Sequence, residues 1–190
     1  MKTLFLLCLL SSPCFSASLT RFSGNVSIND GAVVSPQKVK AGDKITAQGP
    51  KSFFIIRYEN GSRFMVRDGG IQVLKDSPKN KKIDLIKGVL FAYLKPKSKQ
   101  NLEVLTKSAV MAVRGTKFLV SEDPKDTYLC VCEGAVEIKN STGSMSIAKG
   151  QDIHVKSKKS KLKMSGANSA MWTMAQEGFS VLDLKIPELN

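Results

Sequence analysis

Short apolar runs separated by turn residues fill the chain from residue 24 to about residue 156. NVSI (25–28) and KITA (44–47) alternate apolar and polar positions, which is typical of half-exposed strands. SFFIIRY (52–58) and VLFAYL (89–94) are apolar at both parities, as central strands covered on both faces would be. Asn-Gly and Asp-Gly turn signals separate runs that recur about every ten residues. We therefore predict an all-β fold, an antiparallel sandwich or roll of about a dozen short strands.

The pattern changes in the last part of the chain, residues 157–190. A basic segment opens it, and residues 168–177 have the apolar spacing of a short helix that Asn168 can cap. We expect this helix to dock on the sheet. Residues 179–186 are predicted to form a last extended piece that ends at Pro187.

The first 17 residues have the features of an export leader. Lys2 gives a positive start, and LFLLCLL (4–10) is an apolar core too short to span a bilayer. Small residues fit cleavage after Ser16, and cleavage after Ala17 fits nearly as well. We therefore expect an exported protein, periplasmic or secreted, with no integral membrane span.

Removing the leader would leave two cysteines, Cys130 and Cys132, in the strand-like run YLCVC. Residues two apart in a strand lie on one face, and a disulfide between them would be strained. Free, buried cysteines are the first interpretation. A strained redox pair or an intermolecular bridge is the second. A metal site is weaker, because two thiolates supply only half of the four ligands that zinc requires.

An arginine and a glycine interrupt the most strand-like segment of the chain, AVMAVRGTKFLV (109–120). Gly115 permits a sharp bend where the chain passes from one sheet to the other. The Arg114 guanidinium could tie carbonyls or a carboxylate at that corner, and Glu133, beside Gly134, is the candidate partner. We predict an Arg114–Glu133 clasp. The alternative is that Arg114 binds an anion.

Catalytic chemistry is hard to place on this sequence. His154 is the single histidine, and its position on an alternating strand favours a structural or surface role. The sequence contains no nucleophile elbow, no glycine-rich phosphate loop and no histidine cluster. We therefore predict a protein that is not an enzyme and uses no cofactor or metal.

The net charge of +13 favours an acidic partner. Lysines gather at residues 79–82, 95–99 and after Val155, where the candidate binding residues are Lys156, Lys158, Lys159, Lys161 and Lys163. A solvated tail or an exposed strand is the plainer interpretation of that last cluster. Aromatic residues do not alternate with the lysines, which argues against nucleic acid. An anionic envelope polymer or an envelope protein fits better.

A set of short motifs in a fixed order resembles the FecR-domain family of bacterial exported proteins. The motifs are Gly24-x-Val26, Lys40-Ala41-Gly42-Asp43-x-Ile45, Asn60-Gly61-Ser62, Gly88-Val89-Leu90, Thr106-x-x-Ala109-x-x-x-Val113-Arg114-Gly115-Thr116-x-Phe118-x-Val120, Glu133-Gly134-x-Val136 and Gly150-Gln151. The long string from Thr106 to Val120 is the specific part. The signature residues are Arg114, Gly115, Thr116, Glu133 and Gly134, and the domain would cover residues 24–156.

This resemblance implies an all-β periplasmic domain. In the best-known members the domain belongs to a membrane-anchored regulator that relays an outer-membrane receptor's signal to a cytoplasmic sigma factor. The sequence departs from that plan, because it contains neither the cytoplasmic helical segment nor the membrane span. We expect an exported, non-enzymatic binding or scaffold module of the cell envelope. The alternative is a thiol-dependent redox or metal-binding protein that uses Cys130 and Cys132.

Overall fold

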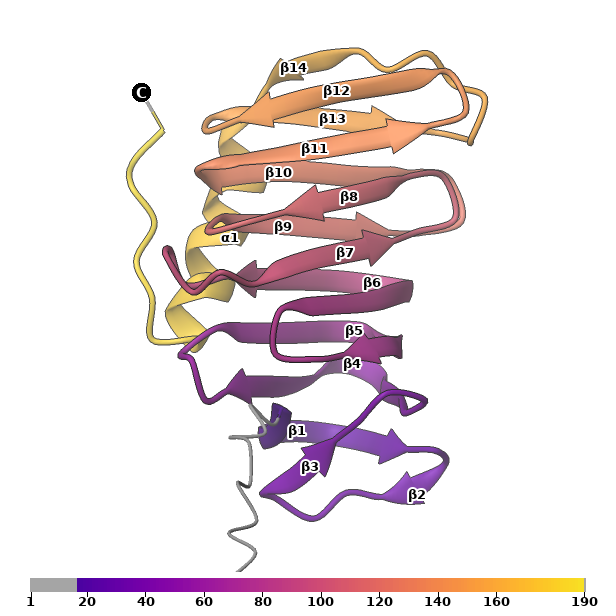
Figure 1. Cartoon of the computed structure of the whole chain (residues 1–190), viewed down its shortest axis with the longest axis vertical. Coiled ribbons are helices and arrows are strands. Elements are labelled where there is room, and N and C mark those ends of the chain that lie inside the picture. Colours follow the sequence, from indigo (N-terminus) through magenta and orange to yellow (C-terminus); the bar gives the residue numbers. More distant parts are fainter. Residues whose placement is uncertain (1–16, 190) are drawn as a thin grey trace, which may run out of the picture.

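The computed structural model describes residues 17–189, so most of the predicted leader lies outside the described residues. Within this range the chain forms fourteen strands and one helix (Figure 1). The elements are β1 (Ala17–Ile28), β2 (Gly31–Ala32), β3 (Gln37–Val39), β4 (Lys44–Tyr58), β5 (Arg63–Asp76), β6 (Asn80–Tyr93), β7 (Asn101–Leu105), β8 (Val110–Val113), β9 (Lys117–Glu122), β10 (Thr127–Glu133), β11 (Ala135–Asn140), β12 (Gly143–Ala148), β13 (Gln151–Val155), β14 (Met164–Gly166) and α1 (Ser169–Val181).

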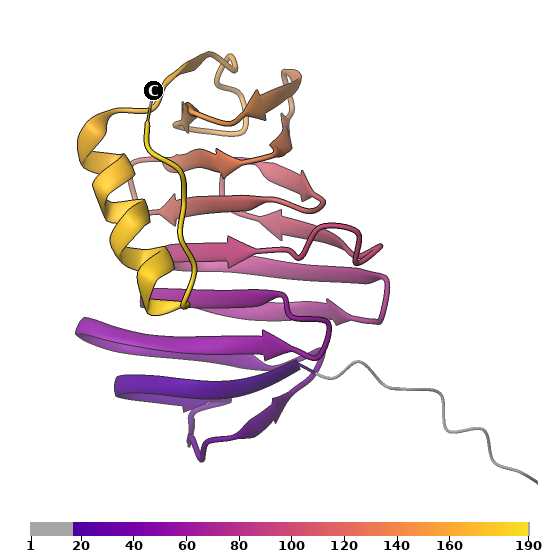
Figure 2. The same cartoon turned by 90° about the vertical axis from the view of Figure 1, so that its left-hand side faces the viewer.

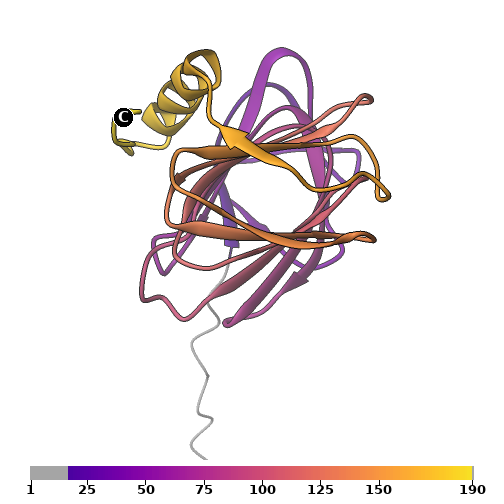
Figure 3. The same cartoon turned by 90° about the horizontal axis from the view of Figure 1, so that it is seen from above.

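The strands form one hydrogen-bonded sheet that folds into two facing layers (Figure 3). The long strand β6 divides the sheet. Its residues 80–84 form a parallel pair with β7, whereas its residues 88–93 form an antiparallel pair with β9. From this division β8, β11 and β12 continue beyond β7, and β10, β13 and β14 continue beyond β9. We call the first group, with β7, the open layer, and the second, with β9, the covered layer.

Four long strands, β1, β4, β5 and β6, bend so that each contributes to both layers. The register shifts where each bend occurs, and glycines stand at the bends. At Gly69 the need for glycine is steric, because an added Cβ would lie 1.9 Å from the Lys87 carbonyl oxygen of the neighbouring strand. The all-β prediction is confirmed. Its short strands at 44–47 and 52–58 are halves of β4, because the intervening residues bend the strand without ending it.

The main core lies between the two layers and takes every second residue of the central strands. On β10, Leu129 and Val131 face this core, whereas Tyr128, Cys130 and Cys132 face the opposite side. A second core forms there, between the outer surface of the covered layer and α1. Strands β4 and β6 also contribute side chains to both cores, so the prediction that these runs are covered on both faces is confirmed.

Helix α1 lies across the outside of the covered layer (Figures 2 and 3). Asn168 caps it as predicted, with its side chain accepting a hydrogen bond from the Met171 backbone N–H. The prediction that residues 179–186 are extended is wrong at its start, since the helix continues to Val181. The reason is packing, because Trp172, Ala175 and Phe179 recur at helical spacing and are all buried against the sheet.

The chain beyond α1 returns along the covered layer and is fastened there by hydrogen bonds. The Trp172 indole N–H donates to the Pro187 carbonyl oxygen at 3.0 Å, and Arg63 donates to the Leu182 carbonyl oxygen at 2.5 Å. Asp183 forms an ion pair with Arg57 at 2.9 Å. In the described part of the chain, no helix has the length and apolarity that a bilayer crossing requires.

Candidate functional site

The outer surface of the open layer is not covered by the helix or the tail (Figures 1 and 2). Five residues in cross-strand register form a row over it, from β6 to β12: Lys82, Glu103, Ala112, Glu137 and Ser146. Their neighbours along each strand turn inward to the main core, as strand alternation requires. The row therefore consists of small and charged residues that the core does not use.

A groove of about 760 Å³ hollows this surface. Ala112, Ala135 and Ser146 line it with short side chains, which leave space above the sheet. Longer polar residues surround that space: Lys75, Asn80, Lys81, Lys82, Asn101, Glu103, Arg114 and Glu137. No pattern in the sequence indicates this groove. Outward positions in the runs 102–105, 109–113 and 135–138 were readable from alternation, but the strand order that joins them was not.

Some of the charges in the groove are already paired. Lys82 and Glu103 form an ion pair with 2.8 Å between Nζ and Oε2. Lys81 is buried, and its ammonium lies 2.5 Å from Asp76 and 4.1 Å from the centre of the Tyr58 ring. By contrast, no described residue forms an ion pair with Lys75, Arg114 or Glu137. These three charges are available to a ligand.

The predicted Arg114–Glu133 clasp is wrong. Glu133 instead pairs with Lys117, with 2.6 Å between Nζ and Oε2. Lys117 and Glu133 stand opposite each other where β9 and β10 pair in the covered layer. Arg114 precedes the corner and is exposed in the groove of the open layer. The corner itself separates the guanidinium from the carboxylate that the sequence suggested.

Thr116 provides the tie at the corner that the sequence suggested for Arg114. Its buried hydroxyl lies 2.9 Å from the Arg114 carbonyl oxygen and 3.0 Å from that of Ala135, so it joins two adjacent crossings between the layers. Gly115 has φ of +60°, and the chain bends there from β8 into β9 as predicted. Gly134 lies at the next crossing, beside Thr116. The signature residues therefore form a structural corner next to the groove.

The lysine-rich segment 156–163 is an ordered loop and is neither a tail nor a strand. The hairpin between β11 and β12 holds it, since the Ser141 N–H donates to the Lys158 carbonyl oxygen and the Asn140 side chain donates to that of Ser160. Leu162 is buried and anchors the loop in the main core. All five lysines of the loop, Lys156, Lys158, Lys159, Lys161 and Lys163, remain exposed.

The two thiols lie in the second core, beneath α1. Cys130 and Cys132 are both free and fully buried on the same face of β10. A hydrogen bond with Cys130, together with burial, raises the pKa of the Cys132 thiol. The same hydrogen bond lowers the pKa of the Cys130 thiol. Neither thiol is exposed, however, and a fully buried thiol is a poor nucleophile and a poor metal ligand. In residues 17–189, no group of three or more His, Cys, Asp or Glu side chains is arranged to hold a metal ion.

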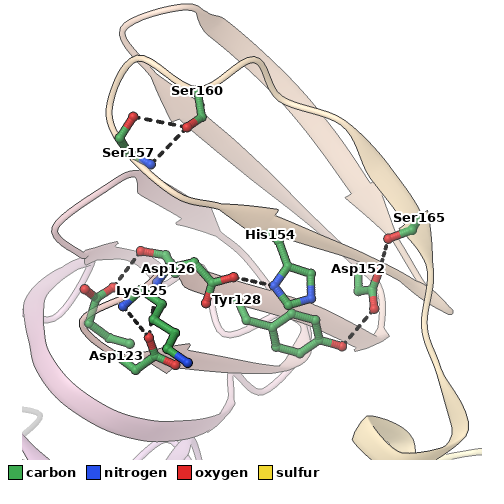
Figure 4. Close-up of polar contacts among 11 residues, drawn as sticks. Asp123, Lys125, Asp126, Tyr128, Asp152, His154, Ser157, Ser160 and Ser165 are labelled. Carbon is green, nitrogen blue, oxygen red and sulfur yellow. Dashed lines mark hydrogen bonds and ion pairs between the residues drawn. The ribbon is translucent and has the colours of Figure 1, made fainter.

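His154 takes part in a surface network that joins β10, β13 and β14 (Figure 4). Its Nδ1 lies 2.5 Å from Asp126 Oδ2, and its ring lies against the Tyr128 ring. The Tyr128 hydroxyl donates to the buried carboxylate of Asp152 at 2.9 Å, and Ser165 donates to the same carboxylate. Each side chain has a partner within the sheet, so the network has the form of a structural tie.

Comparison with known proteins shows that part of the chain is similar to one family. The model of the FecR protein family matches residues 45–137. Two crystal structures of a candidate anti-sigma factor from Parabacteroides distasonis have a similar fold, at 15% identity and with TM-scores of 0.48 and 0.46. Each comparison covers 71% of this chain and 61% of that chain, so the match spans less than two thirds of that protein. No curated protein matches this sequence.

Proposed function

Residues 45–137 of this chain match the model of the FecR protein family, and on that basis we propose that the protein is an exported, non-catalytic binding module of the bacterial cell envelope. The module holds a partner protein on its open layer and serves as a scaffold in an envelope assembly linked to signalling. One observation carries the proposal. The covered layer is buried under α1 and the tail, whereas the open layer presents a groove with three uncompensated charges.

Export follows from the predicted leader, and we place the cleavage after Ser16. Ala17 favours this position because it is fully buried at the start of β1 and pairs with Tyr58 and Val39. Cleavage after Ala17 would remove a residue that belongs to the sheet. The mass of the mature protein from a periplasmic extract tests this position directly.

Site-specific photo-crosslinking in living cells tests the binding role. A photoreactive residue is placed at Ser146 in the groove, and as a matched control at Gln176, which is exposed on α1. We expect a covalent adduct with an envelope protein from position 146 and none from position 176. Adducts from both positions, or from neither, would contradict a partner that occupies the open layer.

A second candidate function rests on the lysine-rich loop. Backbone and side-chain hydrogen bonds, together with buried Leu162, hold this loop in place. Its five exposed lysines therefore form a fixed cationic surface. Such a surface suits an anionic envelope polymer or the anionic surface of a membrane. The thiol-dependent alternative has less support, because both cysteines are buried beneath α1.

A further inference from the structure

We propose that the groove of the open layer binds an extended peptide segment, and that Arg114 anchors an acidic side chain of that segment. This inference rests on the proposed function and names the chemistry of its ligand. The groove crosses six strands in succession, from β5 through β6, β7, β8 and β11 to β12. At a strand spacing of about 4.8 Å it is about 24 Å long, which accommodates about seven residues of an extended chain.

Arg114 is the residue in the groove best suited to a carboxylate. Its guanidinium presents donors in a planar fork that binds a carboxylate through two parallel hydrogen bonds. It is exposed, and no described residue forms an ion pair or side-chain hydrogen bond with it. Binding an acid there would therefore break no existing interaction. Lys75, also without an ion-pair partner, adds a second positive charge to the lining.

The mixture of charges in the groove favours a peptide over a uniformly anionic polymer. Glu137 stands on β11 directly opposite Ala112, and Arg114 follows directly after the end of β8, two residues from Ala112 in the chain. The groove lining near Ala112 thus carries one negative charge, on Glu137, and one positive charge, on Arg114. A chain of phosphate groups would be repelled by the carboxylate of Glu137, which is unpaired among the described residues. A polypeptide can place an acidic group at Arg114 and a basic group or an N–H donor at Glu137.

The remaining lining can satisfy the backbone of such a segment. An extended peptide leaves its N–H and C=O groups unpaired, and each needs a partner when it leaves water. The amides of Asn80 and Asn101, which bond to each other at 3.2 Å, offer both donors and acceptors, as does the Ser146 hydroxyl. Ala112 and Ala135 present no bulky side chain that would keep a backbone away from the sheet.

Selection from a library of random seven-residue peptides displayed on phage tests this inference. The parent chain should enrich peptides that contain Asp or Glu, and Arg114→Gln should weaken the binding of those peptides by about 10- to 100-fold, the range of a charge-assisted hydrogen bond. The charge reversal Arg114→Glu should enrich peptides that contain Lys or Arg. Lys158→Gln, in the lysine-rich loop, is the matched control and should select the same peptides as the parent.

Several outcomes would overturn the inference. Peptides without acidic residues, or the same peptides from the parent and from Arg114→Glu, would show that Arg114 is not the anchor. Binding of polyphosphate that depends on Arg114 and displaces the peptides would favour a phosphate polymer. If no peptide is enriched while the crosslink from position 146 persists, the inference fails and the proposed function stands. Loss of that crosslink as well would remove both. Unchanged thermal unfolding of each variant shows that the fold is retained.

Discussion

Lys117 on β9 forms an ion pair with Glu133 at the end of β10, across 2.6 Å. The same ammonium donates to the Lys185 carbonyl oxygen at 3.0 Å and lies 5.7 Å from the centre of the Tyr93 ring. One side chain thus joins two strands of the covered layer to the tail. The pairing also leaves the neighbouring arginine, Arg114, without a carboxylate partner among the described residues.

This arrangement predicts that two nearby cations differ in their effect on stability. Lys117→Met should lower the free energy of unfolding by about 1 kcal/mol, a value reduced by solvent because Glu133 is partly exposed. Arg114→Met should change it by less than about 0.5 kcal/mol, as is usual for an exposed side chain. Urea denaturation of both variants measures the difference. A larger loss for Arg114→Met would restore the clasp that the sequence suggested.

The bends of the long strands predict a steric penalty at Gly69. Gly69→Ala should lower the free energy of unfolding by about 3 kcal/mol or more, because the new Cβ would overlap the Lys87 carbonyl of the neighbouring strand. Gly42→Ala is the control. Gly42 has φ of +95° with no atom within 4 Å of an added Cβ, so only backbone strain of about 1–2 kcal/mol is expected there. Thermal unfolding measures the stability of both variants, and an equal loss of stability in Gly69→Ala and Gly42→Ala would argue against close strand contact at the bend.

Glu122 predicts a pH dependence of stability. This buried glutamate accepts a hydrogen bond from Thr127 at 2.5 Å, and burial raises its pKa above the ordinary value of 4.5. An acid with a raised pKa binds more protons in the folded state, so its contribution to stability falls as the pH rises through that pKa. Glu122→Gln should therefore gain stability relative to the parent between pH 4.5 and pH 7.

Chemical denaturation at several pH values measures this gain. Glu177→Gln, at an exposed position on α1, is the control and should show no such trend. A difference between Glu122→Gln and the parent that does not change with pH would contradict the assignment. Lys107 lowers the pKa of Glu122, whereas Asp123 and Asp126 raise it. Neutralising each of these three charges in turn shows how much it contributes to the pH dependence assigned to Glu122.

The buried thiols predict that the native protein is unreactive. The mature chain should show no reaction with a thiol reagent in its folded state and should react at both Cys130 and Cys132 after denaturation. Ser180→Cys adds a thiol at an exposed position on α1 and shows that the reagent is active. Thiols that react in the native state, or that remain blocked after denaturation without a reductant, would support the thiol-dependent function.

The lysine-rich loop predicts salt-sensitive binding to anionic vesicles. Each lysine near an anionic membrane surface contributes about 1 kcal/mol, so replacing all five by glutamine should weaken binding at least about 100-fold. Vesicles of phosphatidylglycerol and phosphatidylcholine provide the surface, and co-sedimentation measures the bound fraction. The control removes the same charge at five dispersed, exposed lysines: Lys38, Lys40, Lys51, Lys87 and Lys185. An equal loss of vesicle binding in the loop variant and the control variant, or binding that persists in high salt, would show that the loop does not contact the membrane.

Alternation along the chain was sufficient to predict most strands, because burial on one face imposes a period of two on the sequence. Residues 135–138 and 152–155 fall within β11 and β13 as expected. The bends were not predictable from local sequence. Asp68-Gly69-Gly70 is a typical turn signal, yet β5 continues through it because its neighbours bend at the same level and keep the hydrogen bonds. Local sequence does not distinguish a bend from a turn.

The candidate site was less predictable than the fold, since it depends on strand order. Arg114 was identified as unusual, but its partner was inferred from sequence motifs and not from position in space. The pairing of β8 with β11 in the open layer puts Arg114 and Glu137 in the lining of one groove, and Lys117, beyond the corner, pairs with Glu133. The parallel pairing of β6 with β7, which brings Lys82 beside Glu103, had no signal in the sequence.

Helix α1 and the tail that follows it lie after all fourteen described strands in the sequence, yet they shield Cys130, Phe91 and the other side chains of the second core. A ribosome or a secretion channel releases a polypeptide from its N-terminus onward. Each newly made molecule therefore passes through an interval in which the β-strands have emerged while the apolar side chains of the second core are not yet covered by α1. Chaperones that recognise exposed aromatic and aliphatic groups would bind in this interval, which ends when α1 emerges and packs against the sheet.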